Sequence, residues 1–228
     1  MSALQTFAPR LDILPAPQRR LWEELAATPE QFTLYGGTAI ALQLGHRQSV
    51  DFDFFTTENF APDALKRSVP YLAGGETTQR AENTLTVRAD RGGAVLLSFF
   101  RPPYVKPLAP PLVAADNGLK VAALIDLAGL KADLVQQRAQ AKDFLDLDAL
   151  IAGGVTLIDA MAAARIIHGD DYRPEITLKA LSYFGDGDLP TLGADVRKRL
   201  REAVARADLH EIPSAVSALR ARYGWREE

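Results

Sequence analysis

The sequence predicts an α/β (α+β) fold, in which an N-terminal mixed sheet with flanking helices is followed by a C-terminal helical bundle. Short runs that alternate apolar and polar residues, typical of strands, lie between residues 31 and 101. The segment RPPYVKPLAPPL, from Arg101, holds five of the 14 prolines and indicates a rigid loop or a domain junction. Helical spacing dominates from Leu124 onward. We therefore expect two domains, residues 1–115 and residues 116–228.

Helices and strands alternate in the expected N-terminal domain. We expect helices over residues 17–27, 38–44 and 61–72, and strands over residues 31–35, 50–55, 77–79, 84–89 and 94–101. Asp90-Arg91-Gly92-Gly93 is typical of a hairpin turn between the last two strands. In the strand over residues 50–55, apolar residues alternate with Asp51 and Asp53, so one face should pack on the core and the acidic face should open to a cleft between the domains.

The second half of the chain shows helical periodicity throughout. We expect helices over residues 124–140, 142–152, 157–167, 174–183, 195–207 and 213–223. A hydrophobic content of 47% is ordinary for a globular protein, and no apolar run is long enough for a transmembrane helix. The N-terminus lacks the pattern of a secretion signal, so we expect a cytoplasmic protein with no membrane partner. The lack of cysteine excludes disulfides and thiolate metal sites, and the three histidines lack the spacing of zinc ligands.

The net charge of −3 does not indicate a nucleic-acid-binding protein as a whole. A basic run near the C-terminus is the local exception, and it consists of Arg197, Lys198, Arg199, Arg201 and Arg206. Such a run is typical of a solvated helix face, and an RNA contact is the alternative.

The stretch LYGGTAIALQLGHRQSVDFDFF, from Leu34 to Phe55, carries the candidate site. Asp51 and Asp53 are two residues apart on a strand, so their carboxylates share a face at a spacing of roughly 7 Å. Gly36-Gly37 opens a helix whose free N–H groups favour an anion, and Thr38 could cap that helix while donating to a phosphate. Together these features indicate a site for a triphosphate with Mg²⁺ or Mn²⁺, and hence nucleotidyl transfer. A polar strand face and a tight strand-to-helix turn are the structural alternatives.

This stretch resembles the AbiEii/AbiGii toxin family of nucleotidyltransferases, a branch of the DNA polymerase β-like superfamily. The similarity lies in Gly36-Gly37-Thr38, then Arg47-Gln-Ser49, then Asp51-Phe-Asp53-Phe. The resemblance implies that the glycine turn holds the triphosphate of an NTP. Arg47 and Ser49 are expected either to bind the NTP or to stabilise the loop before the strand.

A second block, DLAGLKADLVQQRAQAKDFLDLDAL from Asp126, is similar to the helical segment of the same family. The resemblance implies that Lys131 neutralises the triphosphate or the departing pyrophosphate, with Arg138 two turns further along the same helix face. It also implies that Asp143 and Asp146 reach back towards the site. Acids in the first turn of a helix are favoured by the helix dipole, so a structural role is the alternative for these two.

One position departs from the family pattern. The polymerase β-like site usually has a third carboxylate on a neighbouring strand, and Ser98 is the residue that aligns with it. A serine brings no charge and is a poor ligand for a hard dication. Glu82, Asp90 and Asp116 are other possible sources of the third acid.

The sequence is therefore compatible with three functions. The first is a metal-dependent nucleotidyltransferase that acts on an RNA (tRNA-like) or protein acceptor, as the toxin of a toxin–antitoxin or phage-defence pair with a cognate antitoxin. The second is a catalytically degenerate NTP-binding module that regulates or binds a partner, which Ser98 favours. The third is a metal-dependent phosphohydrolase, which His46 alone does not support because such enzymes bring more histidines or carboxylates to the metal.

Overall fold

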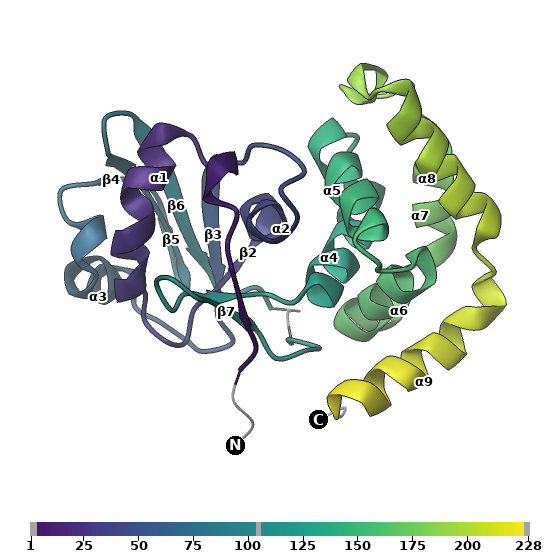
Figure 1. The fold of residues 1–228 in the computed structure, drawn as a ribbon. Helices are drawn as coiled ribbons and strands as arrows, with labels where there is room; N and C mark the ends of the chain where they lie inside the picture. The colour runs from purple at the N-terminus through teal and green to yellow at the C-terminus, as the bar shows by residue number, and fades with distance from the viewer. Residues whose placement is uncertain (1–3, 104–105, 226–228) are drawn as a thin grey trace. The chain divides into compact units, whose positions relative to one another are not determined.

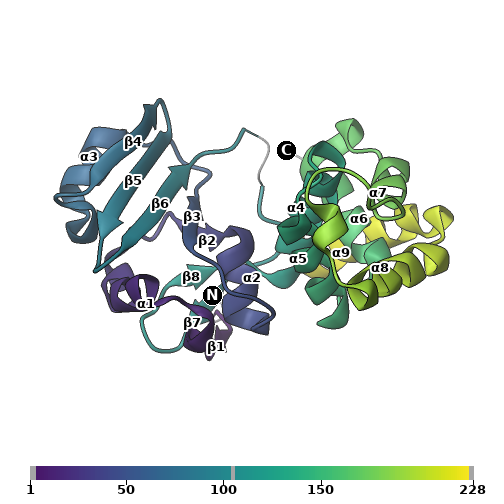
Figure 2. The same cartoon turned by 90° about the horizontal axis from the view of Figure 1, so that it is seen from above.

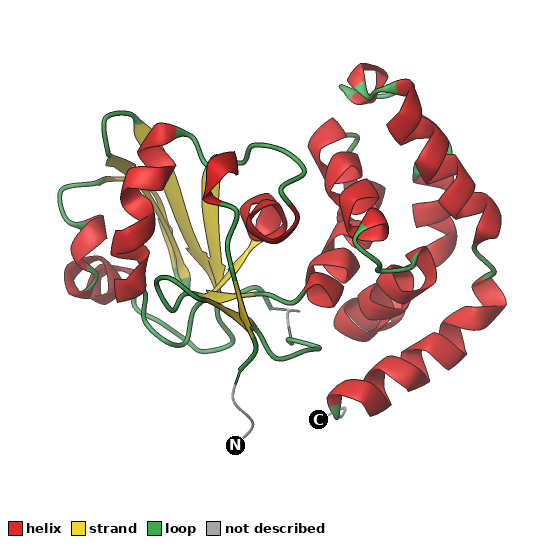
Figure 3. Cartoon of the chain, viewed as in Figure 1, coloured by secondary structure: helices red, strands yellow, loops and turns green. Residues whose placement is uncertain are grey.

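A computed structural model describes residues 4–103 and 106–225 of the chain. The chain divides into two compact units. The sheet unit comprises Met1–Val105 and Pro111–Ala122, and the helical unit comprises Lys106–Pro110 and Ala123–Glu228. In Figure 3 the yellow strands belong to the sheet unit, and the described part of the helical unit consists of helices and loops. The predicted fold class, a mixed sheet with helices followed by a helical region, is confirmed.

An eight-stranded mixed sheet, with strand order β1-β7-β8-β2-β3-β6-β5-β4, forms the centre of the sheet unit (Figure 1). Its strands are Thr6–Phe7 (β1), Thr33–Tyr35 (β2), Asp51–Phe55 (β3), Glu76–Ala81 (β4), Thr84–Asp90 (β5), Ala94–Phe100 (β6), Leu112–Ala114 (β7) and Lys120–Val121 (β8). Strand β3 is antiparallel to β2 and parallel to β6, and β5 is antiparallel to both β4 and β6. The candidate acidic strand is therefore a central strand with a partner on each side.

The alternation along β3 separates a core face from a polar face. Phe52 and Phe54 are fully buried, and Phe54 stacks on Phe99 of β6 with ring centroids 4.9 Å apart. Asp51 and Asp53 point to the opposite face and are half-buried. Fixed burial of the apolar face sets the register of the strand, because a slip of one residue would bury both carboxylates.

Helices of the sheet unit differ from the expected ranges mainly at prolines and helix ends. They are Leu11–Ile13 (η1), Ala16–Trp22 (α1), Glu23–Ala27 (η2), Gly36–Leu44 (α2), Pro62–Ser68 (α3) and Pro70–Leu72 (η3). The single helix expected over residues 61–72 is interrupted before Pro70, whose ring disfavours helical geometry at Val69. Figure 2 shows α2 beside β2 and β3, the strands that flank the candidate site.

Three strands were not predicted: β1, β7 and β8. Each has two or three residues, so none shows the alternation that identifies a strand. Strand β1 lies near the N-terminus, β7 begins at the last residue of the proline-rich segment, and β8 follows that segment. Positions 104 and 105 of the segment are outside the described residues. Strand β8 pairs in parallel with β2 and so extends the sheet beyond the candidate site.

Six α-helices make up most of the described helical unit. They are Leu124–Gln137 (α4), Ala141–Ala152 (α5), Leu157–His168 (α6), Pro174–Ala180 (α7), Ala194–Arg206 (α8) and Ile212–Tyr223 (α9), with short 3-10 turns at Gly169–Asp171 (η4), Leu189–Thr191 (η5) and Leu209–Glu211 (η6). By length and apolar composition, none of the described helices could cross a membrane singly. The bent pair Ala141–Ala152 and Leu157–Asp171, with an angle of 117°, meets those two criteria together.

A buried carboxylate ties the segment Lys106–Pro110 to the start of α4. Asp126 accepts hydrogen bonds from the backbone N–H groups of Leu108, at 2.6 Å, and Ala109, at 3.0 Å. Burial raises the pKa of Asp126 to about 6, although these two donors favour its charged form. The pKa of this carboxyl is thus higher in the folded chain than in the unfolded chain.

We expect this difference to make the protein less stable as pH rises from about 4 to above 6. In that window Asp126 is ionised in the unfolded chain but still protonated in the folded chain. Above that window, where Asp126 is ionised in both states, the free energy of unfolding is lower by on the order of 3 kcal/mol. The Asp126→Asn variant should lack this part of the pH dependence. Thermal melting of both proteins between pH 4.5 and 7.5 measures it, and parallel profiles would contradict the prediction.

Candidate functional site

The two carboxylates of β3 share one face of the sheet, as predicted. Asp53 lies opposite Tyr35 of β2 and opposite Ser98 of β6. Asp51 lies one pleat further along, opposite Leu96. Both carboxylates are half-buried, so they remain accessible from the polar face of the sheet.

The N-terminus of α2 lies directly against this acidic pair. Gly36 has a φ of +74°, and a Cβ at this position would lie 2.7 Å from Oδ2 of Asp53. Only glycine fits here, both for its positive φ and for the close approach of its backbone to a carboxylate. No side chain caps the helix, whose N-cap is Tyr35, so its first N–H groups can bind an anion. The structure thus brings the predicted phosphate-binding turn and the predicted metal ligands together.

We expect Gly36→Ala to disturb both functions of this turn. The positive φ alone should cost about 1–2 kcal/mol in the free energy of unfolding, and the new methyl group would displace the Asp53 carboxylate. Metal-dependent NTP binding should therefore fall by more than the lost stability explains. Gly74→Ala is the matched control, because Gly74 has a φ of +73° with no atom within 4 Å of the added Cβ. Equal NTP affinity in the two variants would contradict this reading of Gly36.

The predicted capping role of Thr38 is wrong. The helix begins two residues earlier, and Thr38 is buried within its first turn. Its hydroxyl contacts Ser49 Oγ at 2.8 Å and the carbonyl oxygen of Asp51. Ser49 is also buried, and the half-buried Arg47 donates from its guanidinium to the carbonyl of Gln48 at 2.9 Å. In this structure Thr38 and Ser49 therefore hold the loop before β3 and fix the backbone of Asp51.

Gln18 is a further contact to this loop that the sequence did not single out. It is buried on α1, and its Nε2 donates to the carbonyl oxygen of Val50 at 2.9 Å. A single glutamine within an amphipathic helix has no pattern that would indicate such a role. Gln18 and Thr38 thus contact the carbonyl oxygens of Val50 and Asp51, in the peptide groups on either side of the Asp51 Cα.

Ser98 occupies the position beside Asp53 where a third carboxylate was expected. It is buried and in register with Asp53 on one side and with Thr86 of β5 on the other. None of the three alternative acids lies on β6, the strand beside Asp53. Asp116 accepts a hydrogen bond from Trp22 Nε1 at 2.8 Å, and Asp90 accepts the N–H groups of its own hairpin turn, at Gly92 and Gly93. Glu82, the remaining alternative, lies in the turn between β4 and β5.

These residues fit a magnesium ion that is shared with a substrate. Within residues 4–103 and 106–225 no three His, Cys, Asp or Glu side chains are grouped so that they could hold a metal ion by themselves. Mg²⁺ commonly takes one or two carboxylates and completes its coordination with phosphate oxygens and water. Asp51 and Asp53 beside an anion-binding helix start meet that requirement.

The second predicted block forms a buried ion cluster in the helical unit. Lys131 of α4 donates to Asp143 Oδ1 at 2.6 Å and pairs with Asp146 Oδ2 at 2.7 Å, both on α5. Its side chain is 7% exposed and those of both acids are 0% exposed. Arg138 completes the cluster, with its Nε 2.7 Å from Asp143 Oδ2 and its own side chain 40% exposed.

The predicted placement of Arg138 on the same helix as Lys131 is wrong. Helix α4 ends at Gln137, and Arg138 has an extended backbone that turns its guanidinium towards Asp143. Burial raises the pKa of Asp143, but the hydrogen bonds and charges of Arg138 and Lys131 outweigh it and hold that pKa below its usual range. Asp143 is therefore ionised at neutral pH, and the cluster binds α4 to α5 through opposite charges.

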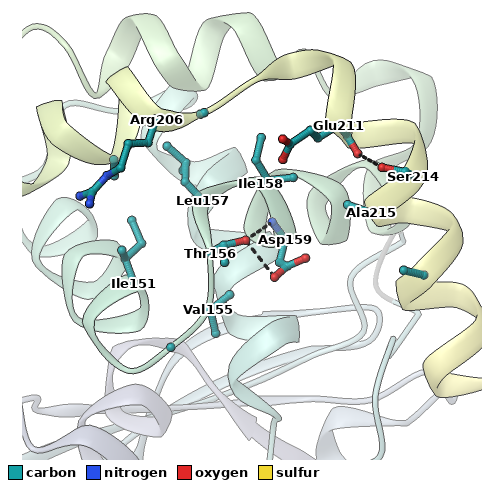
Figure 4. Close-up of a pocket in the computed structure, with 14 residues that line it drawn as sticks. Ile151, Val155, Thr156, Leu157, Ile158, Asp159, Arg206, Glu211, Ser214 and Ala215 are labelled. Carbon is teal, nitrogen blue, oxygen red and sulfur yellow. Dashed lines mark hydrogen bonds between the residues drawn. The ribbon is translucent and has the colours of Figure 1, made fainter.

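A pocket of about 830 Å³ lies elsewhere in the helical unit, between the start of α6 and the end of α8. Figure 4 shows two hydrogen bonds in it: the Thr156 hydroxyl donates to the Asp159 carboxylate, and the Ser214 hydroxyl donates to the backbone carbonyl of Glu211. Among the residues that line it, Arg206 is the one cation, beside two acids and a mainly apolar wall. This composition does not suit a triphosphate, so the pocket is separate from the candidate site.

Comparison with known proteins gives a family match over most of the chain. The family model for the nucleotidyl transferase AbiEii toxin of type IV toxin–antitoxin systems matches residues 20–222. Two solved structures share the fold at 18% identity. MenT4, a nucleotidyltransferase toxin from Mycobacterium tuberculosis H37Rv, has a TM-score of 0.60 with 92% of each chain covered. A candidate nucleotidyltransferase from H. pylori has a TM-score of 0.50, with 90% of this chain and 94% of that chain covered.

A relative from Aquifex aeolicus (strain VF5), the protein aq_aa25, is 36% identical over 119 residues. The match spans 51% of this chain and 55% of that protein, so about half of the relative's length is covered.

Proposed function

Since the chain belongs to the family of AbiEii nucleotidyl transferase toxins of type IV toxin–antitoxin systems, we propose that it transfers a nucleotidyl group from an NTP to an RNA or protein acceptor. One observation carries the proposal: the N-terminus of α2 at Gly36 contacts the carboxylate of Asp53, so an anion-binding helix start and a pair of metal ligands face the same space.

In this reaction the acceptor hydroxyl attacks the α-phosphate, a new phosphoester bond forms, and the bond to the β-phosphate breaks, so that pyrophosphate leaves. Bound Mg²⁺ or Mn²⁺ supplies charge neutralisation for the phosphate oxygens. Asp51 and Asp53 would hold the ion, and the N–H groups at Gly36 and Gly37 would orient the phosphates. Thr38 would act through the Asp51 backbone rather than on the phosphate, because its hydroxyl already contacts the carbonyl of Asp51.

The family resemblance assigns the helical-unit cluster to the same NTP. Lys131 is balanced by two buried carboxylates, so a contact with the triphosphate requires it to exchange one of these partners. Arg138 needs no exchange, because its side chain is 40% exposed while it stays paired with Asp143. We propose that Arg138 is the cation of this cluster that meets a phosphate, and that Lys131 holds Asp143 and Asp146 in position.

Labelled NTPs test the proposal directly. Each of the four α-labelled NTPs is incubated with the protein, total bacterial RNA and Mg²⁺ or Mn²⁺. Label in an RNA band, or in the protein, that depends on Asp51 and Asp53 would support transfer and identify the base and the class of acceptor. Co-expression with a neighbouring gene that restores growth would support a cognate antitoxin and action in the cytoplasm. Failure of every NTP to transfer, with NTP still bound, would contradict the enzymatic proposal.

The second candidate function is an NTP-binding module without transfer activity, and Ser98 favours it. An uncharged hydroxyl replaces the third acid beside Asp53, so the acceptor hydroxyl has no carboxylate on β6 to take its proton. We expect Ser98→Asp to tighten Mn²⁺ binding, measured by titration, because a third carboxylate would join the pair. If the wild-type protein transfers no label and Ser98→Asp does, the site is degenerate; if both transfer, Ser98 is compatible with activity.

A further inference from the structure

A second pocket of the helical unit carries exposed apolar side chains. Four large hydrophobic residues are exposed among the described residues: Leu4, Val50, Ile176 and Tyr183. The last two line the same pocket of about 380 Å³. Tyr183 is 59% exposed and lies three residues after the end of α7. Exposed apolar side chains that gather at one hollow indicate a binding site more than isolated ones do.

The Tyr183 ring lies beside Gly185. A Cβ at Gly185 would lie 2.6 Å from Cζ of Tyr183, so the ring lies against the backbone of Gly185, where only glycine leaves room for it. The next residue, Phe184, is buried and packs edge-on against Phe144, with centroids 6.1 Å apart. One side of the Tyr183 ring therefore lies against the chain at Gly185, and the rest of its aromatic surface is exposed.

Two cations line the same pocket as this aromatic ring. Lys179 and Arg138 line the pocket, and Lys179 is exposed without an ion pair in the described chain. The guanidinium of Arg201 lies over the ring of Phe184, 5.0 Å from its centroid. Asp186 is the one acid among the lining residues. A stacking surface beside positive charges is the combination that binds single-stranded nucleic acid, in which bases stack and phosphates meet lysine and arginine.

We propose that this pocket binds an unpaired nucleotide of an RNA acceptor, with a base stacked on Tyr183 and an adjoining phosphate on Lys179. The proposal rests on the proposed function, because it names the acceptor of that reaction as single-stranded RNA. Arg138 belongs both to the lining of this pocket and to the ion cluster, where it pairs with Asp143. The larger pocket near α6 lacks an aromatic side chain among its lining residues, so it does not offer the same chemistry.

Binding of RNA, measured without any transfer reaction, tests the proposal. Fluorescence anisotropy with the full chain and a labelled ten-nucleotide single-stranded RNA of mixed sequence gives the dissociation constant. We expect Tyr183→Ala and Tyr183→Leu to weaken binding by roughly 5- to 100-fold, because both remove the aromatic face. Tyr183→Phe should bind as the wild type does. Gly185→Ala keeps the tyrosine but displaces its ring, so it should weaken binding as well.

Charge variants complete the test. Lys179→Ala should lower the slope of log affinity against log salt concentration by about 0.7, because one phosphate contact is lost from a single strand. Arg222→Ala is the matched control, since Arg222 is an exposed arginine on α9 that stacks on Tyr223 and lies outside the pocket lining. A 5-iodouridine in the RNA should form its photo-crosslink at Tyr183.

Several results would overturn the proposal. No RNA binding by the wild-type chain would do so, as would an unchanged affinity in Tyr183→Ala. Equal binding by Tyr183→Leu and Tyr183→Phe would show an apolar contact without stacking, which is what a protein partner would make. Failure of the transfer reaction while Tyr183 still governs RNA affinity would count against the proposed enzyme and leave the RNA site standing. The two proposals therefore fail by different measurements.

Discussion

Replacing Asp51 and Asp53 together by asparagine is expected to abolish metal-dependent NTP binding, with a loss in affinity of more than roughly 100-fold. Both carboxylates point to the polar face of the sheet, and asparagine keeps their shape while it removes the charge that Mg²⁺ requires. The fold should survive, because the core face of β3 is formed by Phe52 and Phe54 and stays unchanged. Calorimetric titration of NTP with and without Mg²⁺ measures the effect.

A control for this variant is Asp63→Asn. Asp63 is an exposed acid of the same unit, and its carboxylate pairs with exposed Arg80. It should leave both NTP affinity and metal dependence unchanged. NTP affinity that persists in the double variant at every Mg²⁺ concentration would contradict the assignment of the metal site to β3.

Replacing Lys131 by methionine is expected to produce the largest loss of stability, about 3–5 kcal/mol in the free energy of unfolding. Methionine fills most of the space of the lysine stem but leaves Asp143 and Asp146 buried without the ammonium group that both contact. Arg138 pairs with Asp143 and can compensate only in part. Chemical denaturation followed by circular dichroism, which reports the loss of helix, measures the change.

A second variant separates stability from NTP binding at this position. Adding Asp143→Asn and Asp146→Asn to Lys131→Met removes the uncompensated charges and should restore a large part of the lost stability. If Lys131 also contacts the triphosphate, this restored variant should bind NTP less tightly while its affinity for AMP stays the same. Equal losses for NTP and AMP would place Lys131 in a structural role, as the cluster geometry suggests.

The sequence predicts the acidic strand well because its information is local. In β3 each phenylalanine that enters the core forces the neighbouring aspartate to the other face, so Asp51 and Asp53 could be placed from alternation alone. The glycine at position 36 could be recognised as a turn, but its contact with Asp53 depends on the pairing of β2 with β3. Strand pairing is a long-range property that local pattern does not contain.

The predictions for Thr38 and Arg138 were wrong for the same physical reason, because tertiary contacts determine where both side chains lie. Thr38 has the composition of a helix cap, yet tertiary contacts with Ser49 and the Asp51 backbone determine where its hydroxyl points. Arg138 follows a strong helical pattern, and its exit from the helix is stabilised by its pairing with Asp143, five residues later. The strands β7 and β8 are too short to show any period, so their place in the sheet could be seen only in three dimensions.

Residues 111–122 belong to the sheet unit but are synthesised after most of its sheet. Strands β7 and β8 lie between β1 and β2 in the sheet, yet they are the last strands to be made. While the nascent chain ends before residue 120, one edge of β2 has no partner strand. The paired strands β2 and β3, which place Gly36 beside Asp53, then lie at the edge of an open sheet. Unpaired strand edges are prone to aggregate. Translation that stops in the proline-rich segment would therefore release a fragment with the complete glycine turn and acidic pair but without β7 and β8. Such a fragment should be inactive and poorly soluble.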